Sequence, residues 1–353
     1  MDRRLSRLAA AMLRPGADSR SAAWVKTHVP ADQPVDLHAL AAAVEPDSGR
    51  HAGMVQAACA AATRAYEHAD AGRCRLCFVG EPDYPARLAE IADPPIVVWA
   101  RGAAPLDGNA VAIVGSRAAT PDGQHIAREL AGELARRGYV VVSGMAAGID
   151  GAAHAAAVQA GGVSIGVLGC GVDVVYPARH KALASAMVEH GVLVSELPLG
   201  TGPRPYHFPL RNRVISGLSR GVVLIEAGKG SGSLITARTA SEQGRDVMAV
   251  PGNVRTGRSK GCHALIRDGA RLIETIDDVL EELEGLQPQS GSGETRPLPL
   301  SRLEATMAPS ASYSLDDLAQ LTGWSGTDLL VELAQLEIEG RVARDAGGRF
   351  VRG

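Results

Sequence analysis

Six short apolar runs recur through the middle of the chain, and a segment of helix length separates each from the next. They are rich in valine and isoleucine and lie at 111–115, 139–143, 163–168, 192–195, 222–226 and 247–250. Strands that are apolar on both sides are buried on both faces, and helices between them indicate parallel crossovers. The pattern therefore predicts an α/β fold, a Rossmann-like, doubly wound and mostly parallel sheet covered by helices on both faces.

The segments between the runs carry helix signals. Thr120 precedes Pro121, so a capping side chain stands next to a proline whose missing N–H costs nothing in the first helical turn. Ligands of open parallel sheets bind at the carboxyl ends of the strands. The residues that follow each apolar run are therefore the candidate site residues.

The pattern changes at both ends of this region, and we predict four segments. Residues 1–78 form a helical N-terminal domain, 79–286 an extended Rossmann-like domain, 287–300 a linker rich in Pro, Ser and Gly, and 301–353 a small second domain. The last segment shows two helices with leucines at helical spacing, followed by two short strands around Gly347 and Gly348. Helix, turn, helix and hairpin together predict a winged helix-turn-helix.

Composition narrows the class of protein. With 353 residues, of which 46% are hydrophobic, the chain can fill a sizeable core. No apolar run approaches the roughly 18 residues that span a bilayer, and Arg14 and Pro15 interrupt the N-terminal apolar stretch, so we expect a cytoplasmic protein without membrane contact.

The five cysteines are an odd number, which favours reduced thiols. Cys74 and Cys77 form one CxxC without a second pair, so no metal site is expected.

Charge is unevenly distributed. The formal net charge is -3, yet 12 Lys or Arg and only 4 Asp or Glu lie within 199–271. A basic segment in an acidic chain is typical of a protein that binds an anion, although charge alone is equally compatible with a solvated surface.

Glycine, serine and arginine follow the first two strands. Gly115, Ser116 and Arg117 end the first, and Ser143 and Gly144 end the second within "SGMAAGID". Glycine lets the backbone approach a ligand, and a helix N-terminus offers unpaired N–H groups to an anion. Two neighbouring strands that end in this way favour one shared phosphate-binding crevice.

The stretch "HFPLRNRVISGLSRGVVLIEAGKGSGSLITA" adds two further walls. A short helix would carry the "RNR" triplet, with its two arginines on different sides, and the later glycine-rich turn would form a second cradle of N–H groups. The candidate anion-binding residues here are Arg211, Asn212, Arg213, Lys229, Gly230, Ser231 and Ser233.

Several common chemistries are absent from this pattern. The glycine turn lacks Walker A spacing, and "GVLGCG" has the wrong spacing for a dinucleotide site, so no nucleotide cofactor is expected. His154 fits a packed core position better than a catalytic base, and Glu226 has no partner nucleophile or metal. The site suits holding a ligand rather than cleaving one, and we expect no enzyme activity.

The motifs together resemble the DNA-processing protein A family, called DprA or Smf. The resemblance rests on "VAIVGSRAATPDG", "VVSGMAAGIDGAAHAAA", "GVDVVYP", "HFPLRNRVISGLS", "GSGSLITARTASEQGRDVMAVPGN" and "GCHALIRDGA", in the order of the family and over about two-thirds of the chain.

The resemblance implies a homodimeric recombination mediator that binds single-stranded DNA, protects incoming strands during natural transformation and helps to load RecA. It implies neither nuclease nor ATPase activity. Arg117 would be the principal phosphate contact, with Ser143 and Gly144 beside it. Phe208 would stack on a base, and Lys181, Arg211 and Arg213 would add positive charge.

Two alternatives follow from the same residues. A nucleotide N-glycosidase of the phosphoribohydrolase type also has Gly-rich phosphate loops, but it needs a glutamate just after them, and none occurs here before Glu242. A structural scaffold would leave the basic segment unexplained.

The two ends of the chain depart from the simplest family pattern. Residues 1–78 lack the Gly-rich helix-hairpin-helix signature of a SAM-like domain. The second helix of the winged-helix segment has no basic residue and would repel a phosphate backbone, which predicts a protein-contact module. Its acidic residues are Asp328, Glu332, Glu337 and Glu339.

Overall fold

The computed structural model describes residues 2–13, 27–28, 33–44, 48–284, 303, 306–307, 312–338, 342–344 and 349–352. It contains two compact units, Met1–Gln287 and Pro288–Gly353. The predicted linker, 287–300, lies outside the described residues.

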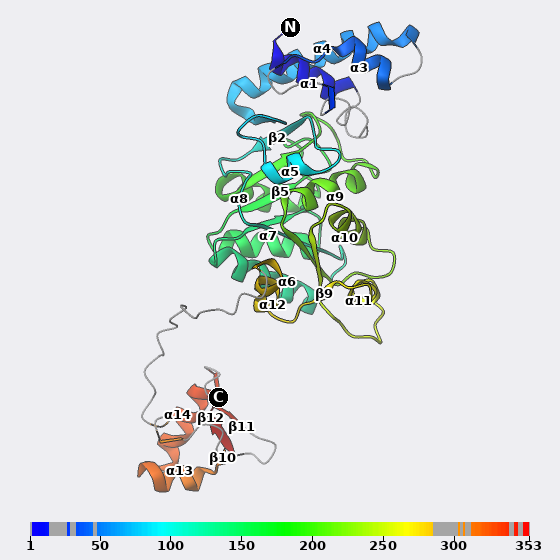
Figure 1. The fold of residues 1–353 in the computed structure, drawn as a ribbon. Coiled ribbons are helices and arrows are strands. Elements are labelled where there is room, and N and C mark those ends of the chain that lie inside the picture. Colours follow the sequence, from blue (N-terminus) through cyan, green and yellow to red (C-terminus); the bar gives the residue numbers. More distant parts are fainter. Residues whose placement is uncertain are drawn as a thin grey trace. The chain divides into compact units, whose positions relative to one another are not determined.

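A nine-stranded sheet organises the first unit (Figure 1). Its strands are β1 (Arg75–Phe78), β2 (Val97–Arg101), β3 (Ala110–Gly115), β4 (Val140–Ser143), β5 (Ser164–Val167), β6 (Val192–Ser195), β7 (Gly221–Ile225), β8 (Asp246–Ala249) and β9 (Arg271–Leu272). Their order is β1-β2-β6-β5-β4-β3-β7-β8-β9. All pairs from β6 to β9 are parallel, whereas β1 pairs with β2, and β2 with β6, in antiparallel register.

The prediction of a doubly wound, mostly parallel sheet is confirmed. The six apolar runs became β3 to β8, each shifted by no more than a residue or two at its ends. Every residue of β4, β5, β6 and β7 is buried, as expected for strands covered on both faces. The antiparallel edge of β1 and β2 and the short β9 were not predicted.

Helices cover both faces. On one side α6 (Pro121–Arg136), α7 (Ile149–Gln159) and α12 (Ile276–Glu284) pack against side chains such as Ile113 and Val223. On the other side, α5 (Ala86–Glu90), α9 (His207–Leu218), α10 (Ser233–Glu242) and α11 (Lys260–Arg267) pack against Val114 and Leu224. The turn η3 (Ala178–His180) leads into α8 (Lys181–His190), which packs against Leu193.

The predicted start of α6 is confirmed. Thr120 is its N-cap, its hydroxyl accepts a hydrogen bond from the Gly123 N–H at 3.1 Å, and proline occupies the first turn. The same hydroxyl donates to a carboxylate oxygen of Glu226 at 2.5 Å. The cap therefore ties the start of α6 to the end of β7.

The N-terminal helices share a hydrophobic core with the antiparallel edge of the sheet. They are α1 (Arg3–Leu13), α3 (Leu37–Val44) and α4 (His51–His68), with short turns η1 (Ser48–Arg50) and η2 (Ala69–Arg73). Leu8 and Leu40 pack in one cluster with Phe78 and Trp99, and Figure 1 shows these helices gathered next to β2. Whether 1–78 folds as a separate domain stays a prediction.

The second unit has the element order of a winged helix, as predicted. It contains β10 (Ser312–Tyr313), α13 (Leu315–Thr322), α14 (Gly326–Ile338), β11 (Val342–Arg344) and β12 (Phe350–Arg352), with a sheet in the order β10-β12-β11. Its own core includes Leu318, Leu329, Leu333 and Phe350. The turn glycines Gly347 and Gly348 lie outside the described residues.

Within the described part of the chain, no helix has the length and apolar character needed to cross a membrane.

Candidate nucleic-acid interface

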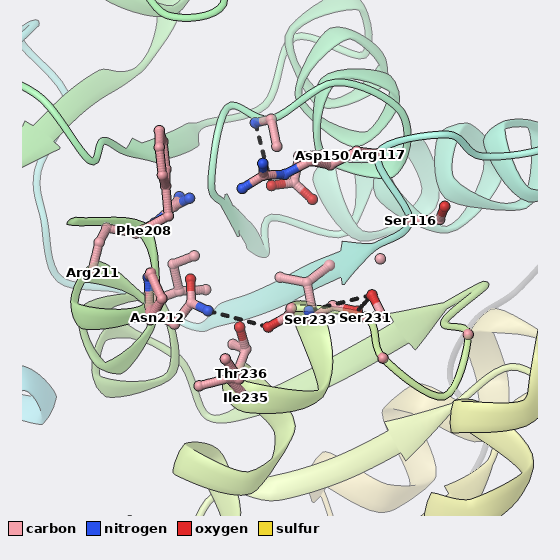
Figure 2. A pocket seen from close by; sticks show the side chains of 18 of the residues that line it. Ser116, Arg117, Asp150, Phe208, Arg211, Asn212, Ser231, Ser233, Ile235 and Thr236 are labelled. Carbon is pink, nitrogen blue, oxygen red and sulfur yellow. Dashed lines mark hydrogen bonds between the residues drawn. The ribbon is translucent and has the colours of Figure 1, made fainter. Parts of the chain in front are cut away.

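The sheet has a topological switch point between β3 and β7. From β3 the chain builds β4, β5 and β6 in one direction, and it then returns to place β7, β8 and β9 on the other side. Crossovers on opposite faces leave a crevice at the carboxyl ends of two such strands, which is where ligands bind in this class of fold. A cavity of about 740 Å³ opens at this place (Figure 2).

The cavity is lined by segments that are far apart in sequence. Figure 2 shows Arg117 and Asp150 on one side, with Asn212, Ser231 and Ser233 facing them. The end of β3, the glycine-rich loop before α10 and the first turns of α9 meet here. Of the predicted site residues, the structure brings these to the cavity: Gly115, Ser116, Arg117, Phe208, Arg211, Asn212, Gly230, Ser231 and Ser233.

Glycine is required where β3 ends. A Cβ added to Gly115 would lie 1.9 Å from the Ile225 carbonyl oxygen, which is a backbone atom and cannot swing away. The absence of a side chain lets β3 and β7 approach at the cavity floor. The glycine after β4 has a related role, because a Cβ at Gly144 would lie 2.0 Å from a guanidinium nitrogen of Arg211.

Arg117 and two aromatic rings form one wall. The Arg117 guanidinium lies 5.1 Å from the centroid of the Phe208 ring, and the Tyr176 ring lies 5.4 Å from Phe208 at an interplanar angle of 38°. This stacking orients the arginine by a cation–π contact. Arg117 makes no ion pair with another residue that the structure describes, so its charge faces the cavity uncompensated.

Arg211 lies deeper and is 7% exposed. One of its terminal nitrogens donates to the Val167 carbonyl at 2.6 Å, while its Nε has no hydrogen-bond partner among the described residues. Burial lowers the pKa of the Arg211 guanidinium to about 10, so it remains charged at neutral pH. A buried cation with an unpaired donor beside an open cavity is suited to an anionic ligand.

The single acid that lines this cavity among the described residues is used for structure. Asp150 accepts hydrogen bonds from the N–H groups of Gly144 at 3.1 Å and Ala146 at 3.4 Å. Burial raises the pKa of Asp150 above its ordinary value, although Arg211 opposes this shift. The carboxylate therefore fixes the loop before α7, a helix whose N-cap is Gly148.

The glycine-rich loop provides free donors. The N–H groups of Gly230 and Gly232 have no hydrogen-bond partner among the described residues. The two hydroxyls of Ser231 and Ser233 lie 2.7 Å apart, and Asn212 donates to the Gly232 carbonyl at 3.4 Å. Free N–H groups and hydroxyls in one loop at the start of α10 form a cradle for an anion.

Four predicted site residues are placed elsewhere. Arg213 points away and pairs with Asp93 at 3.1 Å and Glu196 at 2.5 Å, so it braces α9 against two loops. The Ser143 hydroxyl is fully buried and donates to the Ile113 carbonyl. Lys181 and Lys229 are exposed and line neither this cavity nor the one beside it.

Gly144 lines an adjoining cavity of about 290 Å³, which shares Arg117, Tyr176 and Phe208 with the larger one. Sequence reasoning did not select Tyr176, Ile235 or Thr236, which also line the larger cavity. A tyrosine directly before Pro177, after an apolar run, was the available signal for the first of these.

The alternative enzyme chemistry finds no support in the placement of the acids and bases. Glu226 accepts from the Thr120 N–H at 2.9 Å and pairs with Arg258, and Glu242 is exposed and pairs with Arg238. His154 is fully buried, its Nδ1 lies 2.8 Å from the Ser164 hydroxyl, and burial lowers its pKa to about 3. It is a core residue, as the sequence indicated.

The CxxC cysteines also lie in packed surroundings. Cys77 is fully buried in the sheet, and burial raises its pKa to about 12 and that of Cys74 to about 11. The described residues contain no group of three or more His, Cys, Asp or Glu side chains placed to hold a metal ion.

Fold and cavity together define a Rossmann-type protein that has a cavity suited to an anion and an additional winged-helix unit. The family model for DNA recombination-mediator protein A matches residues 75–284, and the DprA winged helix domain matches residues 289–348. The chain belongs to the DprA/Smf family of DNA-processing proteins.

Known relatives agree over most of the chain. Protein Smf of Escherichia coli K12 is 40% identical over 299 residues, which cover 78% of this chain and 79% of its own. The structure of DNA processing protein A from Streptococcus pneumoniae is similar with a TM-score of 0.70 at 35% identity, over 78% of this chain and 95% of that one. The Helicobacter pylori protein, described for its single-stranded DNA binding mode, has a TM-score of 0.53 at 29% identity, over 60% and 96%.

Proposed function

We propose that this protein binds single-stranded DNA in the switch-point cavity, called here the strand cavity, and acts as a recombination mediator. The observation that carries the proposal is the uncompensated Arg117 stacked on Phe208 at the mouth of a cavity with free N–H donors. Binding of single strands without sequence preference needs positive charge for phosphates and aromatic faces for bases. One wall of the strand cavity offers both the positive charge and the aromatic faces.

The roles of the individual residues follow from their positions. Arg117 would contact a phosphate at the rim, and Arg211 would add a fixed charge below it. The loop with Ser231 and Ser233 would accept a second phosphate, while Phe208 and Tyr176 would offer ring faces to a base. The single-stranded DNA binding described for the Helicobacter pylori relative supports a single strand as the ligand.

The cellular role extends the same proposal. A cytoplasmic homodimer would protect incoming strands during natural transformation and help to load the RecA recombinase onto them. Family membership supports this role. The winged-helix unit would contact protein rather than duplex DNA, because the described acids of α14 include Asp328 and Glu332.

We propose no catalytic step. Among the described residues one acid lines the strand cavity, Asp150, and its carboxylate is committed to two backbone N–H groups. A nucleotide N-glycosidase would need a carboxylate free to face the sugar, and the glycine-rich loop supplies none. The cavity is arranged to hold a polyanion.

Fluorescence anisotropy of labelled oligo-dT tests the proposal. The full chain is titrated across a salt series, with duplex DNA of equal length as the comparison. Arg117→Glu should weaken single-strand binding by at least about tenfold and reduce the salt dependence, since each lost phosphate contact removes about 0.7 from the logarithmic slope. Arg128→Glu is the matched control, because Arg128 is exposed on α6 and donates to Gln124.

Tight, salt-sensitive binding that is lost in Arg117→Glu and kept in Arg128→Glu would support the strand cavity. Equal affinity for duplex and single strand, or full binding by Arg117→Glu, would contradict it. Nucleoside monophosphates would then be tested as substrates.

A further inference from the structure

A second cavity, called here the junction cavity, lies where the N-terminal helices meet the sheet. Its volume is about 790 Å³, and α1, α4, the end of β2 and the loops after β5 and β6 contribute to its lining. None of its described lining residues also lines the strand cavity. Nothing in the proposed function uses it.

Two arginines from different elements line the junction cavity. Arg64 extends from α4 and Arg101 from the end of β2, and both side chains are exposed. Neither makes a hydrogen bond or ion pair with any residue that the structure describes. Other arginines near the sheet behave differently: Arg213 and Arg245, for example, are paired with acids. Two unpaired guanidinium groups in one cavity are available to an incoming anion.

The acid in the junction cavity does not neutralise these arginines by a direct contact. Both carboxylate oxygens of Asp173 accept a hydrogen bond from the Gly200 N–H, at 2.9 and 3.0 Å. This contact holds the loop after β5 against the loop after β6. The lining therefore keeps an excess of positive charge.

The remaining lining is largely apolar. Met12, Ala61, Ala65, Pro198 and Leu199 contribute carbon atoms to the cavity wall. A volume of about 790 Å³ exceeds the smallest pockets that accept small organic ligands, which begin near 300 Å³. This lining suits a ligand that carries a phosphate on a flat or weakly polar group. The phosphate would contact the two guanidinium groups, and the rest of the ligand would contact the apolar wall.

We propose that the junction cavity binds the phosphate group of a nucleotide, with the base or sugar against its apolar wall. Two sources share this chemistry: a free mononucleotide, or a nucleotide of a DNA strand that continues beyond the strand cavity. The second source rests on the proposed function, whereas the first does not.

Continuity of the loops connects the two sites. The segment after β5 places Asp173 in the junction cavity and Tyr176 in the strand cavity. The segment after β6 does the same with Leu199 and Pro205. A ligand that shifts either loop at one cavity would therefore also move part of the wall of the other.

Calorimetric titration of the full chain tests the free-nucleotide source. The probe is dTMP, and thymidine is its match without phosphate. Titrations use Arg117→Glu chains, so that the strand cavity does not contribute. Adding Arg64→Ala and Arg101→Ala together should weaken dTMP binding by at least about tenfold. Arg128→Ala in the same background is the matched control and should leave dTMP binding unchanged.

The continuing-strand source is tested in chains that keep Arg117. Oligo-dT of about 6 and about 20 nucleotides is titrated, because a short strand can occupy one cavity and a long strand can reach both. Substitution of Arg64 and Arg101 should weaken binding of the long strand by about tenfold and leave the short strand within twofold.

Each result decides the proposal. Arginine-dependent binding of dTMP but not of thymidine supports the free nucleotide, and arginine-dependent binding of the long strand alone supports the continuing strand. The proposal is overturned when dTMP and the long strand both bind independently of the two arginines. A separate result would contradict the proposed function itself: the Arg117→Glu chain would bind oligo-dT as tightly as the unchanged chain.

Discussion

At the scale of single residues, the geometry of the strand cavity depends on Gly115. Its position beside the Ile225 carbonyl leaves no room for a Cβ, as the 1.9 Å distance shows. Gly115→Ala should therefore force β3 and β7 apart and lower the free energy of unfolding by at least about 2 kcal/mol. Urea unfolding followed by tryptophan fluorescence measures this loss.

Gly230 provides the comparison for that experiment, because no heavy atom of the described residues lies within 4 Å of a Cβ placed there. Gly230→Ala should leave the unfolding midpoint nearly unchanged. Equal stability of the two variants would show that the close approach at position 115 does not constrain the sheet.

His154 makes stability depend on pH. Its pKa is about 3 in the fold against an ordinary value of 6.5, because burial disfavours the imidazolium. Below pH 6.5 the unfolded chain binds a proton that the folded chain excludes, so stability is retained above 6.5 and falls as pH drops towards 3. The expected slope from this group is about 1.4 kcal/mol per pH unit.

Urea unfolding at pH 7 and pH 5 measures that slope. His154→Gln should flatten it, and His125→Gln, at an exposed position on α6, should not. An unchanged slope in His154→Gln would assign the acid sensitivity to other groups.

The types of residue near the strand cavity could be predicted better than the directions in which their side chains point. The sequence places two arginines around Asn212, and a helix must send residues two positions apart to different sides. Nothing local says which side faces the ligand. Arg211 is held by the Val167 carbonyl and lies near Asp150, which lines the cavity, whereas Arg213 faces away because Asp93 and Glu196 lie on its side. These partners come from distant strands and loops.

At the scale of elements, Arg213 fixes the position of α9. It joins that helix to Asp93, after α5, and to Glu196, after β6, with a side chain that is 14% exposed. Arg213→Ala leaves two acids without their cation and should lower the free energy of unfolding by roughly 2–3 kcal/mol, somewhat less than for a fully buried pair. The affinity for oligo-dT should change by less than twofold.

Thermal or urea unfolding together with anisotropy separates these effects. If the Arg213→Ala variant keeps its stability but loses oligo-dT binding, Arg213 contributes to DNA binding after all. Arg245→Ala offers a matched control, since Glu90 is the one described acid with which Arg245 forms an ion pair.

Strands buried on both faces could be predicted from composition, and edge strands could not. The runs that became β3 to β8 are continuous and apolar, whereas β9 has two residues and both are exposed. The strand β2 carries the apolar run "VVWA" but follows two prolines and is not separated from β1 by a long helix. Its pairing with β6, which lies almost a hundred residues later, depends on the completed sheet.

At the scale of the whole molecule, the two units have separate cores. The core of the second unit draws its residues from Leu303 to Phe350, and the strand cavity draws its lining from 114–236. The net charge of -3 is the sum of an acidic second unit, a basic site and the rest of the chain. The overall charge therefore does not indicate a DNA-binding protein. Function therefore has to be argued for each unit.

Truncation after Gln287 tests this separation. Because the first unit holds the strand cavity and its whole supporting core, residues 1–287 should keep the unfolding temperature of that unit and bind oligo-dT within about twofold of the full chain. The isolated 288–353 segment should bind neither duplex nor single strand, since Asp328 and Glu332 on α14 repel phosphates. Calorimetry and anisotropy measure both parts. A large loss of affinity on truncation would mean that the winged-helix unit itself contributes to strand binding, and the acidic face of α14 would then have to lie away from the DNA.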